Sequence, residues 1–342
     1  MVKVIEYNAG KLTILDQRLL PNEEKYLECT TVEDVVYAIK ELAVRGAPLI
    51  AISAAYGVCV GLHQYKDLKK LDYIFSILRE ARPTAYNIFL ILERLEKKIK
   101  STKSQDFYET LNIVEKEALE IHNEDKKLCI EIAKNGRTII PPNANIITIC
   151  NTGMLATGGI GTALGVIYQG FWDGKIKEVF VLETRPLLQG ARLTTYELTK
   201  NNVPTTLITD NMISFLFSKH KIDLAIVGAD RIVKNGDTAN KIGTYTLAVV
   251  CNHFKIPFYV AAPYTTIDLN LENGKEIIIE ERSPNEVRFF KNQRIANENV
   301  KVWNPAFDIT PSSLITAIIT DKGIFKPHEI SKIKTNYPTN IS

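Results

Sequence analysis

The chain has 342 residues, of which 45% are hydrophobic and 24% charged, and its formal net charge is only +3. This is the composition of an ordinary globular protein, and the length allows two domains with separate cores. Lys and Arg are scattered among acidic residues, which argues against nucleic acid or a membrane surface as a partner.

The cysteines are odd in number and widely spaced, and none forms a Cys-x-x-Cys pair. Cys59 with His63 and Cys251 with His253 are isolated pairs, so we expect neither a zinc site nor a disulfide framework. The first ten residues do not resemble a secretion signal, and no later run is expected to reach membrane-spanning length. We therefore predict a reduced, cytoplasmic protein.

Residues 1–125 are expected to form a smaller, mostly helical domain. Two alternating runs broken by Asn8-Ala9-Gly10-Lys11 predict a short N-terminal hairpin. Thr31 with Asp34 resembles a capping box, which begins a helix that should end at Gly46.

Proline marks the start of the next helices. Pro48 suits the first turn of a helix that should be buried on nearly all sides from Leu49 to Leu62, and Pro83 opens another in the same way. Asp106 to Lys134 predicts one or two amphipathic helices. The domain boundary is placed inside this last stretch, at residue 125.

Residues 126–342 are expected to form a Rossmann-like domain, a doubly wound parallel sheet of the α/β class. Near-continuous apolar runs are typical of strands covered on both faces, and here they alternate with helical segments. The predicted strands are Ile146–Cys150, Glu178–Leu182, Thr205–Thr209, Leu224–Val227 and Pro257–Ala261.

Two of these strands end in residues that can move protons. Cys150 closes the first predicted strand, and Asp230 closely follows the run at Leu224. The carboxyl edge of a parallel sheet is where such folds place their chemistry, and burial there can keep an Asp protonated. The alternatives are a Cys that acts as a small hydrophobe and an Asp that caps a helix or pairs with Arg231.

A glycine-rich turn follows Cys150 and leads into a helix. Backbone N–H groups at such a helix start can bind an anion, although small residues there also permit close packing. Gly159, Gly161 and Gly165 miss the spacing of a dinucleotide fingerprint. Asp210, also at a strand end, is expected to cap the helix from Asn211 to Lys219.

Polar residues after other strands supply candidate substrate contacts. The run Glu183 to Arg192 contains Gln189, and Asn240-Lys241 follows the loop after Asp230. In the helical domain, Arg45 and Arg82 each stand just before a helix that Pro initiates. A guanidinium can bind phosphate bidentately beside the free amides of the first turn, so a phosphorylated small molecule is expected.

Five ordered blocks resemble the methylthioribose-1-phosphate isomerases. This family belongs to the group that includes ribose-1,5-bisphosphate isomerases and the regulatory subunits of the guanine-nucleotide exchange factor of eukaryotic translation initiation. The resemblance covers nearly the whole chain, and its blocks are Arg45–Gly57, Arg82–Asn87, Cys150–Ile167, Glu183–Leu198 and Val227–Tyr245.

The resemblance implies a proton-donating Asp, matched by Asp230, and a Cys that supports the transition state, matched by Cys150. It implies substrate contacts from Arg45, Gly46, Ala47, Arg82, Gln189, Asn240 and Lys241. It also implies a homodimer, and it implies no cofactor or metal. The implied reaction is the aldose–ketose isomerisation of 5-methylthioribose 1-phosphate, an intramolecular redox step of methionine salvage.

Two positions depart from the family pattern, and the second of them, Met154, leaves the substrate open. Ala81 stands where Ser is common, and Met154 replaces a smaller residue. The alternatives are 5-deoxyribose 1-phosphate or ribose 1,5-bisphosphate as substrate. A non-catalytic regulatory subunit is the alternative from another class, and it would have no need of both Cys150 and Asp230.

Overall fold

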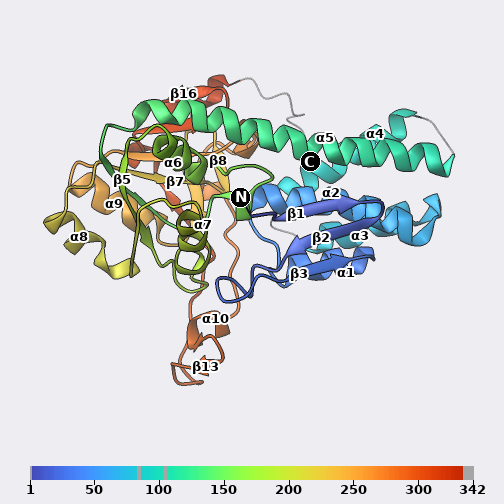
Figure 1. Cartoon of the computed structure of the whole chain (residues 1–342), viewed down its shortest axis with the longest axis horizontal. Coiled ribbons are helices and arrows are strands. Elements are labelled where there is room, and N and C mark those ends of the chain that lie inside the picture. The colour runs from blue at the N-terminus through green and yellow to red at the C-terminus, as the bar shows by residue number, and fades with distance from the viewer. Residues whose placement is uncertain (1, 83–85, 103–105, 334–342) are drawn as a thin grey trace. The chain divides into compact units, whose positions relative to one another are not determined.

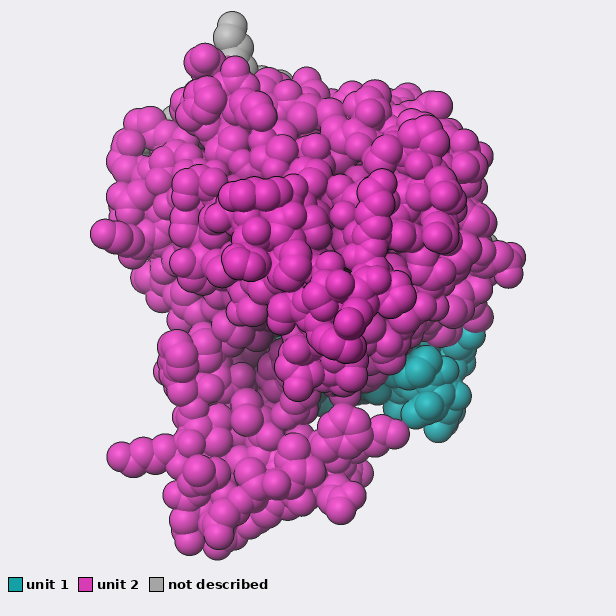
Figure 2. Space-filling model, turned by 90° about the vertical axis from the view of Figure 1, so that its left-hand side faces the viewer, with its two compact units in different colours: residues 1–130, 152–161 teal, residues 131–151, 162–342 magenta. Residues whose placement is uncertain are grey.

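The computed structural model describes residues 2–82, 86–102 and 106–333, which form two compact units coloured separately in Figure 2. Unit 1 contains the chain up to Ile130 together with Thr152–Gly161. Unit 2 contains Glu131–Asn151 together with the chain from Thr162 onward. The predicted division into domains 1–125 and 126–342 stays a prediction.

Unit 1 begins with a three-stranded antiparallel sheet, which Figure 1 shows in dark blue. The predicted hairpin is confirmed: β1 (Ile5–Asn8) pairs with β2 (Lys11–Leu15) across the turn at Ala9 and Gly10. The third strand, β3 (Tyr26–Cys29), pairs with β2. Leu12 and Ile14 of β2 are fully buried, so one face of the sheet packs on the helices.

The capping box at Thr31 is confirmed, but the predicted end of its helix is wrong. The Thr31 hydroxyl accepts the Asp34 N–H, and Asp34 in turn accepts the Thr31 N–H, at the start of α1 (Val32–Lys40). The helix ends at Lys40 rather than Gly46. Leu42 adopts a left-handed φ of 58°, which a continuing helix cannot contain.

Helix α2 (Ala47–Tyr65) has Pro48 in its first turn and is buried from Leu49 through Leu62, as predicted. By length and composition alone this helix could cross a membrane, contrary to the expectation that no run would be long enough. However, 78% of its most apolar window is buried inside the protein, as in the core helix of a soluble protein.

The described residues of unit 1 also form the α-helices α3 (Leu71–Glu80), α4 (Tyr86–Thr102) and α5 (Phe107–Gly136). The stretch predicted as one or two amphipathic helices is a single helix, α5, whose last turns enter unit 2. Pro83, predicted to open a helix, lies outside the described residues. A mostly helical N-terminal region is therefore confirmed.

The central sheet of unit 2 is doubly wound, as predicted. Its order is β16-β15-β10-β7-β4-β5-β6, and all neighbours are parallel except the antiparallel edge pair β15 and β16. The first strand of this sheet in the chain, β4, is an inner strand, with β5 and β6 on one side and β7, β10, β15 and β16 on the other. The strands are β4 (Ala144–Thr148), β5 (Ile176–Leu182), β6 (Thr205–Ile208), β7 (Leu224–Val227), β10 (Phe258–Ala261), β15 (Ala317–Thr320) and β16 (Gly323–Phe325).

Both faces of this sheet are covered. Ile146 and Ile147 are successive residues of β4, so their side chains point to opposite faces, and both are fully buried. Helix α6 packs against β5 and β10, and α9 packs against β10. The helices of unit 2 are α6 (Ala163–Trp172), α7 (Thr195–Lys200), α8 (Ile213–Lys219), α9 (Thr244–His253) and the short α10 (Asn285–Arg288).

Besides strands β15 and β16 of the central sheet, two further parts of unit 2 were not predicted. A second sheet of order β11-β8-β9-β14 follows the carboxyl end of β7, and an arm built from α10 and the β12–β13 hairpin projects at the bottom of Figures 1 and 2. The strands are β8 (Arg231–Val233), β9 (Thr238–Lys241), β11 (Ile267–Asp268), β12 (Phe289–Phe290), β13 (Gln293–Arg294) and β14 (Phe307–Thr310).

Candidate active site

The carboxyl ends of β4 and β7 lie side by side in unit 2. The two strands are parallel neighbours, with Ile147 beside Ala225, and the chain order reverses between them. In open α/β sheets, ligands bind in the crevice above such a switch point. Cys150 follows β4 and Asp230 follows β7, so the two residues expected to carry the chemistry leave adjacent strands at this edge.

Cys150 stands in a tight turn with a left-handed backbone, φ 63°. Its N–H donates to the Thr184 hydroxyl at 2.9 Å, and its carbonyl accepts from the Thr194 hydroxyl at 2.5 Å. Holding a non-glycine residue in this region costs about 1–3 kcal/mol, and such strain persists where surrounding contacts enforce it. Both backbone polar groups of Cys150 are therefore fixed by buried threonines.

The residue after Cys150 is tied to a buried carboxylate. The Asn151 side-chain amide donates to Glu197 Oε1 at 2.7 Å and to the Thr194 hydroxyl at 3.3 Å. Glu197 is fully buried in α7, and the Tyr168 hydroxyl approaches its other oxygen at 3.4 Å. Sequence reasoning missed Thr184, Thr194 and Glu197, because hydroxyls and a lone Glu in a polar stretch give no local signal.

Gln189 lies at the start of the segment that carries Thr194. Its side chain is buried, and among the described residues its Oε1 has no hydrogen-bond partner. A buried acceptor without a donor is uncommon in folded proteins, which is consistent with a ligand hydroxyl at this point. The chain then forms a π-helical turn, Gly190–Thr194, a distortion often found at functional sites.

Asp230 is half-buried between the main sheet and the second sheet. Its N–H donates to the Ala239 carbonyl at 2.9 Å, which places it beside the end of β9. Arg231, named as a possible partner for Asp230, lies 3.7 Å from the Asp268 carboxylate of β11. The β8–β9 hairpin thus brings Asp230 close to Asn240.

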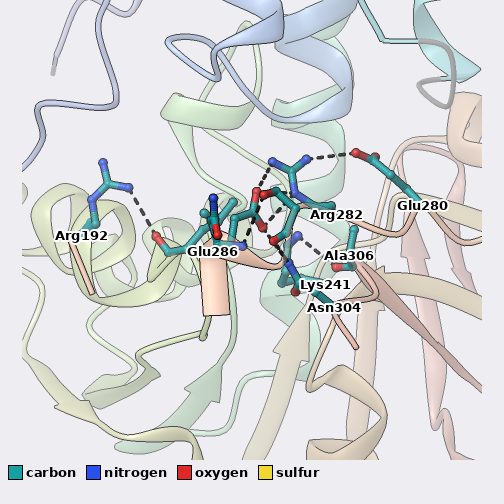
Figure 3. Close-up of polar contacts among 10 residues, drawn as sticks. Arg192, Lys241, Glu280, Arg282, Glu286, Asn304 and Ala306 are labelled. Carbon is teal, nitrogen blue, oxygen red and sulfur yellow. Dashed lines mark hydrogen bonds and ion pairs between the residues drawn. The ribbon is translucent and has the colours of Figure 1, made fainter. Parts of the chain in front are cut away.

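Asn240 and Lys241 are buried on β9. The Asn240 amide donates to the Thr244 hydroxyl at 3.1 Å. As Figure 3 shows, the Lys241 ammonium donates to the Ala306 carbonyl, at 3.0 Å, and it also lies 4.8 Å from the ring centroid of Phe307. Lys241 therefore also holds β9 against the start of β14.

Acidic groups missed from the sequence surround this end of β9. Asp308 accepts the N–H groups of Gly243 and Tyr245 at the start of α9, and burial raises its pKa to about 6. At the base of the arm, Arg282 pairs with both Glu280 and Glu286 (Figure 3). Burial lowers the pKa of Arg282, but these carboxylates more than offset it.

Unit 1 holds the remaining predicted contacts: Arg45, Gly46, Ala47 and Arg82. Arg45 precedes α2, whose first residue is Ala47, so the predicted arrangement of an Arg before a Pro-initiated helix is present here. Gly46 has a φ of 87°, and a Cβ on it would lie 2.5 Å from the Ala156 Cα. Arg82 is half-buried after α3.

The glycine-rich segment Thr152–Gly161 packs within unit 1 against α5. Asp125 accepts the Gly158 N–H at 2.6 Å, and His122 Nε2 donates to the Gly158 carbonyl at 3.2 Å. His122 Nδ1 accepts from the Tyr56 hydroxyl, so the ring is neutral, and burial followed by Lys126 lowers its pKa to about 4. Burial raises the pKa of Asp125 to about 6.

The prediction that Asp210 caps the following helix is wrong. Its carboxylate accepts the N–H groups of Thr184 and Arg185, at 2.8 and 2.7 Å, and thereby fixes the turn after β5. Helix α8 begins only at Ile213, with no side-chain cap. Among the described residues, no group of His, Cys, Asp and Glu side chains is arranged to hold a metal ion.

Known proteins resemble this chain over almost its full length. A model of the initiation factor 2 subunit family matches residues 43–327. The methylthioribose-1-phosphate isomerase of Caldicellulosiruptor saccharolyticus is 50% identical over 97% of this chain and 99% of its own. That of Thermotoga petrophila is 50% identical over 97% of both chains.

Solved structures are also similar to this chain over almost its full length. The 5-methylthioribose 1-phosphate isomerase of Pyrococcus horikoshii has a TM-score of 0.91 at 40% identity and covers 97% of this chain and 95% of its own. A structure described as translation initiation factor eIF-2B, subunit delta, from A. fulgidus has a TM-score of 0.86 at 39% identity, covering 97% of this chain and 100% of its own.

Proposed function

We infer that this chain is an aldose–ketose isomerase, because it belongs to the initiation factor 2 subunit family and, within it, to the methylthioribose-1-phosphate isomerases. The reaction converts 5-methylthioribose 1-phosphate to 5-methylthioribulose 1-phosphate, a step of methionine salvage. The structural observation that supports this activity is the pair Cys150 and Asp230, which follow adjacent parallel strands at the switch point of the sheet.

Asp230 is proposed to open the sugar ring. The anomeric oxygen of an aldose 1-phosphate is esterified and has no proton to lose, so the ring cannot open as in a free sugar. A protonated Asp230 would donate to the ring oxygen as the ring bond breaks. Asp230 is half-buried and its N–H lies beside β9, at the strand end where the substrate is proposed to bind.

Cys150 is proposed to assist transfer of the hydrogen from C2 to C1. In one mechanism it removes the C2 proton and an enolate-like intermediate forms. In the other, a hydride moves directly and the site stabilises the developing charge. General acid–base help is worth roughly 10²- to 10⁴-fold, so positioning and exclusion of water must supply the rest of the acceleration.

The remaining residues are proposed to bind the substrate. Arg45, Arg82 and Lys241 supply positive charge for the phosphate, and the amides at Gly46 and Ala47 lie at the start of α2. Asn240 and Gln189 would orient the sugar hydroxyls. The buried Gln189 Oε1, which lacks a donor among the described residues, supports this role.

The assignment of the two chemical residues is tested with Asp230→Asn and Cys150→Ser. Each variant should lower kcat by about 10²-fold or more and change KM little, because each change removes a chemical group rather than a binding group. Cys251→Ser makes the same substitution at a buried cysteine of α9 outside the site and should keep kcat. Turnover like that of the wild type in either site variant would refute the assignment.

A substrate panel tests the activity itself. Buried Met154 and Leu155 suit an apolar methylthio group, whereas ribose 1,5-bisphosphate needs a second anion site. We expect the highest kcat/KM with 5-methylthioribose 1-phosphate. A higher value with 5-deoxyribose 1-phosphate or the bisphosphate would reassign the substrate, and binding without any product would favour a regulatory subunit.

We also propose that the protein is a homodimer and acts in the cytoplasm. The family resemblance supports the dimer, and the free state of all five cysteines is compatible with a reducing compartment. Light scattering during size-exclusion chromatography should give twice the mass of one chain. The mass of a single chain would contradict the dimer, and a fluorescent fusion viewed in cells tests the compartment.

A further inference from the structure

Glu197 is a buried carboxylate that none of the proposed chemical steps uses. It is fully buried on the short helix α7, directly after the π-helical turn that begins next to Gln189. Buried carboxylates are rare unless hydrogen bonds or charges compensate them. Its hydrogen bond with Asn151 leads back to Cys150.

The hydrogen bonds between Glu197 and Cys150 have a fixed direction. The Asn151 amide donates one N–H group to Glu197 Oε1 and the other to the Thr194 hydroxyl. The Thr194 hydroxyl accepts the second Asn151 N–H, so its own proton is free to be donated to another acceptor. It donates that proton to the carbonyl of Cys150, at 2.5 Å.

The other side of Cys150 is held in the same way. The Thr184 hydroxyl donates to the Leu182 carbonyl at 2.9 Å, so its lone pairs face the Cys150 N–H. The Cys150 N–H is thus hydrogen-bonded to Thr184, and the Cys150 carbonyl is hydrogen-bonded to Thr194. The left-handed turn, and with it the direction in which the thiol leaves the strand end, depends on these ties.

We propose that Glu197 is a positioning residue: through Asn151 and Thr194 it holds the turn that presents Cys150 to the substrate. The effect on turnover rests on the proposed function, whereas the effect on the Cys150 turn does not. The Tyr168 hydroxyl also contacts Glu197, and burial together with this carboxylate raises the Tyr168 pKa. That contact lies outside the path to Cys150.

The test compares Glu197→Leu with Glu197→Gln. Leucine removes the acceptor of the Asn151 amide, whereas glutamine can still accept through its Oε1. Glu197→Leu should lower kcat for 5-methylthioribose 1-phosphate by about 10-fold or more with less than about a threefold change in KM. Glu197→Gln should keep kcat within about threefold of the wild type, because the direction of the hydrogen bonds is preserved.

A second readout follows the thiol directly. The rate at which iodoacetamide alkylates Cys150 in the folded enzyme, measured by peptide mass spectrometry, should change by about fivefold or more in Glu197→Leu and stay near the wild-type rate in Glu197→Gln. Tyr168→Phe, which removes the Tyr168 contact to the same side chain, should alter neither kcat nor the alkylation rate. Thermal unfolding verifies that each variant is folded.

Asn151→Ala breaks the hydrogen bond between Asn151 and Glu197 from the other side, while Glu197 stays in place. If Glu197→Leu does not fold, this variant tests the proposal in its stead. It should reproduce the loss of kcat and the changed alkylation, and the double variant should be no worse than the worse single variant. Wild-type kcat and alkylation in folded Glu197→Leu, or in folded Asn151→Ala, would overturn the proposal.

Losses of kcat in Glu197→Gln and Tyr168→Phe as large as the loss in Glu197→Leu would also overturn the proposal, since they would indicate a general effect of packing. If the wild-type protein turns over none of the three sugar phosphates, the proposed function fails instead. The alkylation rates then still decide whether Glu197 holds the Cys150 turn.

Discussion

The segment between β4 and α6 is held at its two ends by different chemistry. In unit 2, Cys150 and Asn151 are tied by what we call the threonine anchor: Thr184, Thr194 and Glu197. In unit 1, Gly158 is held by what we call the Asp–His anchor, Asp125 and His122 of α5. Most contacts of the first anchor use groups that do not titrate, whereas both groups of the second titrate between about pH 4 and 6. Mild acid should therefore act on the glycine-rich end of the segment first.

The comparison is tested most severely by adding one methyl group at each anchor. A Cβ on Gly190, beside the threonine anchor, would lie 1.7 Å from the Leu182 carbonyl oxygen, which is backbone at the end of the inner strand β5 and cannot move aside easily. A Cβ on Gly158 would meet side-chain atoms of His122 and Ile52 at 2.6–2.7 Å, which can shift. Gly190→Ala should cost more than about 3 kcal/mol and Gly158→Ala about 1–2 kcal/mol, measured by urea unfolding. Equal losses of unfolding free energy in the two variants would show that the surroundings of both glycines adjust equally well to an added methyl group.

The next largest effect concerns His122. Its folded pKa of about 4 lies below the ordinary 6.5, so its stabilising contribution is complete above pH 6.5 and is lost as the pH falls through 4. His122→Gln keeps a donor for Gly158 but does not titrate. From pH 7 to pH 4, the stability advantage of the wild type over this variant should shrink by about 3 kcal/mol. Urea unfolding followed by circular dichroism measures it, and an unchanged difference would contradict the assignment.

Asp125 should show the opposite sign in the same window. Its folded pKa of about 6 lies above the ordinary 3.8, so its contribution is complete below pH 3.8 and is lost as the pH rises through 6. Relative to the wild type, Asp125→Asn should gain about 2 kcal/mol between pH 4 and pH 7, a value reduced for the partial exposure of this carboxyl. The same unfolding series measures it. A slope of the same sign as that of His122→Gln would refute this account.

The smallest effect compares two buried threonines. Thr194→Val removes the hydroxyl that donates to Cys150 and should cost about 1 kcal/mol together with a fall in kcat. Thr148→Val makes the same change in β4, where the buried hydroxyl has no partner among the described residues, and should be neutral or stabilising. Thermal unfolding and steady-state kinetics on both variants provide the comparison. An equal loss in Thr148→Val would mean that volume, not hydrogen bonding, sets the cost.

The local features of this fold were visible in the sequence, but the pairing of distant parts was not. The apolar runs of β4 and β7 lead directly to Cys150 and Asp230, which is why those two could be placed at strand ends. That these strands are neighbours follows from the order of the sheet, which chain order does not reveal. Strand β15 was missed because it is a four-residue run that follows an excursion of some fifty residues after β10.

Side-chain partners were the least predictable part. Asp210 has the sequence position of a helix cap, but its carboxylate instead accepts hydrogen bonds from the backbone N–H groups of Thr184 and Arg185, which follow β5. The apolar residues after Lys40, where α1 ends, continue the helical spacing in the sequence. Leu42 nevertheless turns the chain out of the helix, and Ala43 and Val44 are buried in the core without being helical. In both cases a tertiary contact outweighs a local preference, and tertiary contacts cannot be found from a single sequence.

The division of the chain into interleaved units has a consequence for its biosynthesis. Unit 1 includes Thr152–Gly161, whose Leu155 carbonyl accepts the buried Gln17 amide and whose Ala156 packs against Gly46. On the ribosome these residues emerge only after the first strand of the other unit, β4, has been made. A nascent chain that ends at Ile130 therefore carries the described α-helices that begin in unit 1, α1 to α5, but lacks the residues that close its core. The half of the protein that is synthesised first must wait for a part of the second half before it can finish folding.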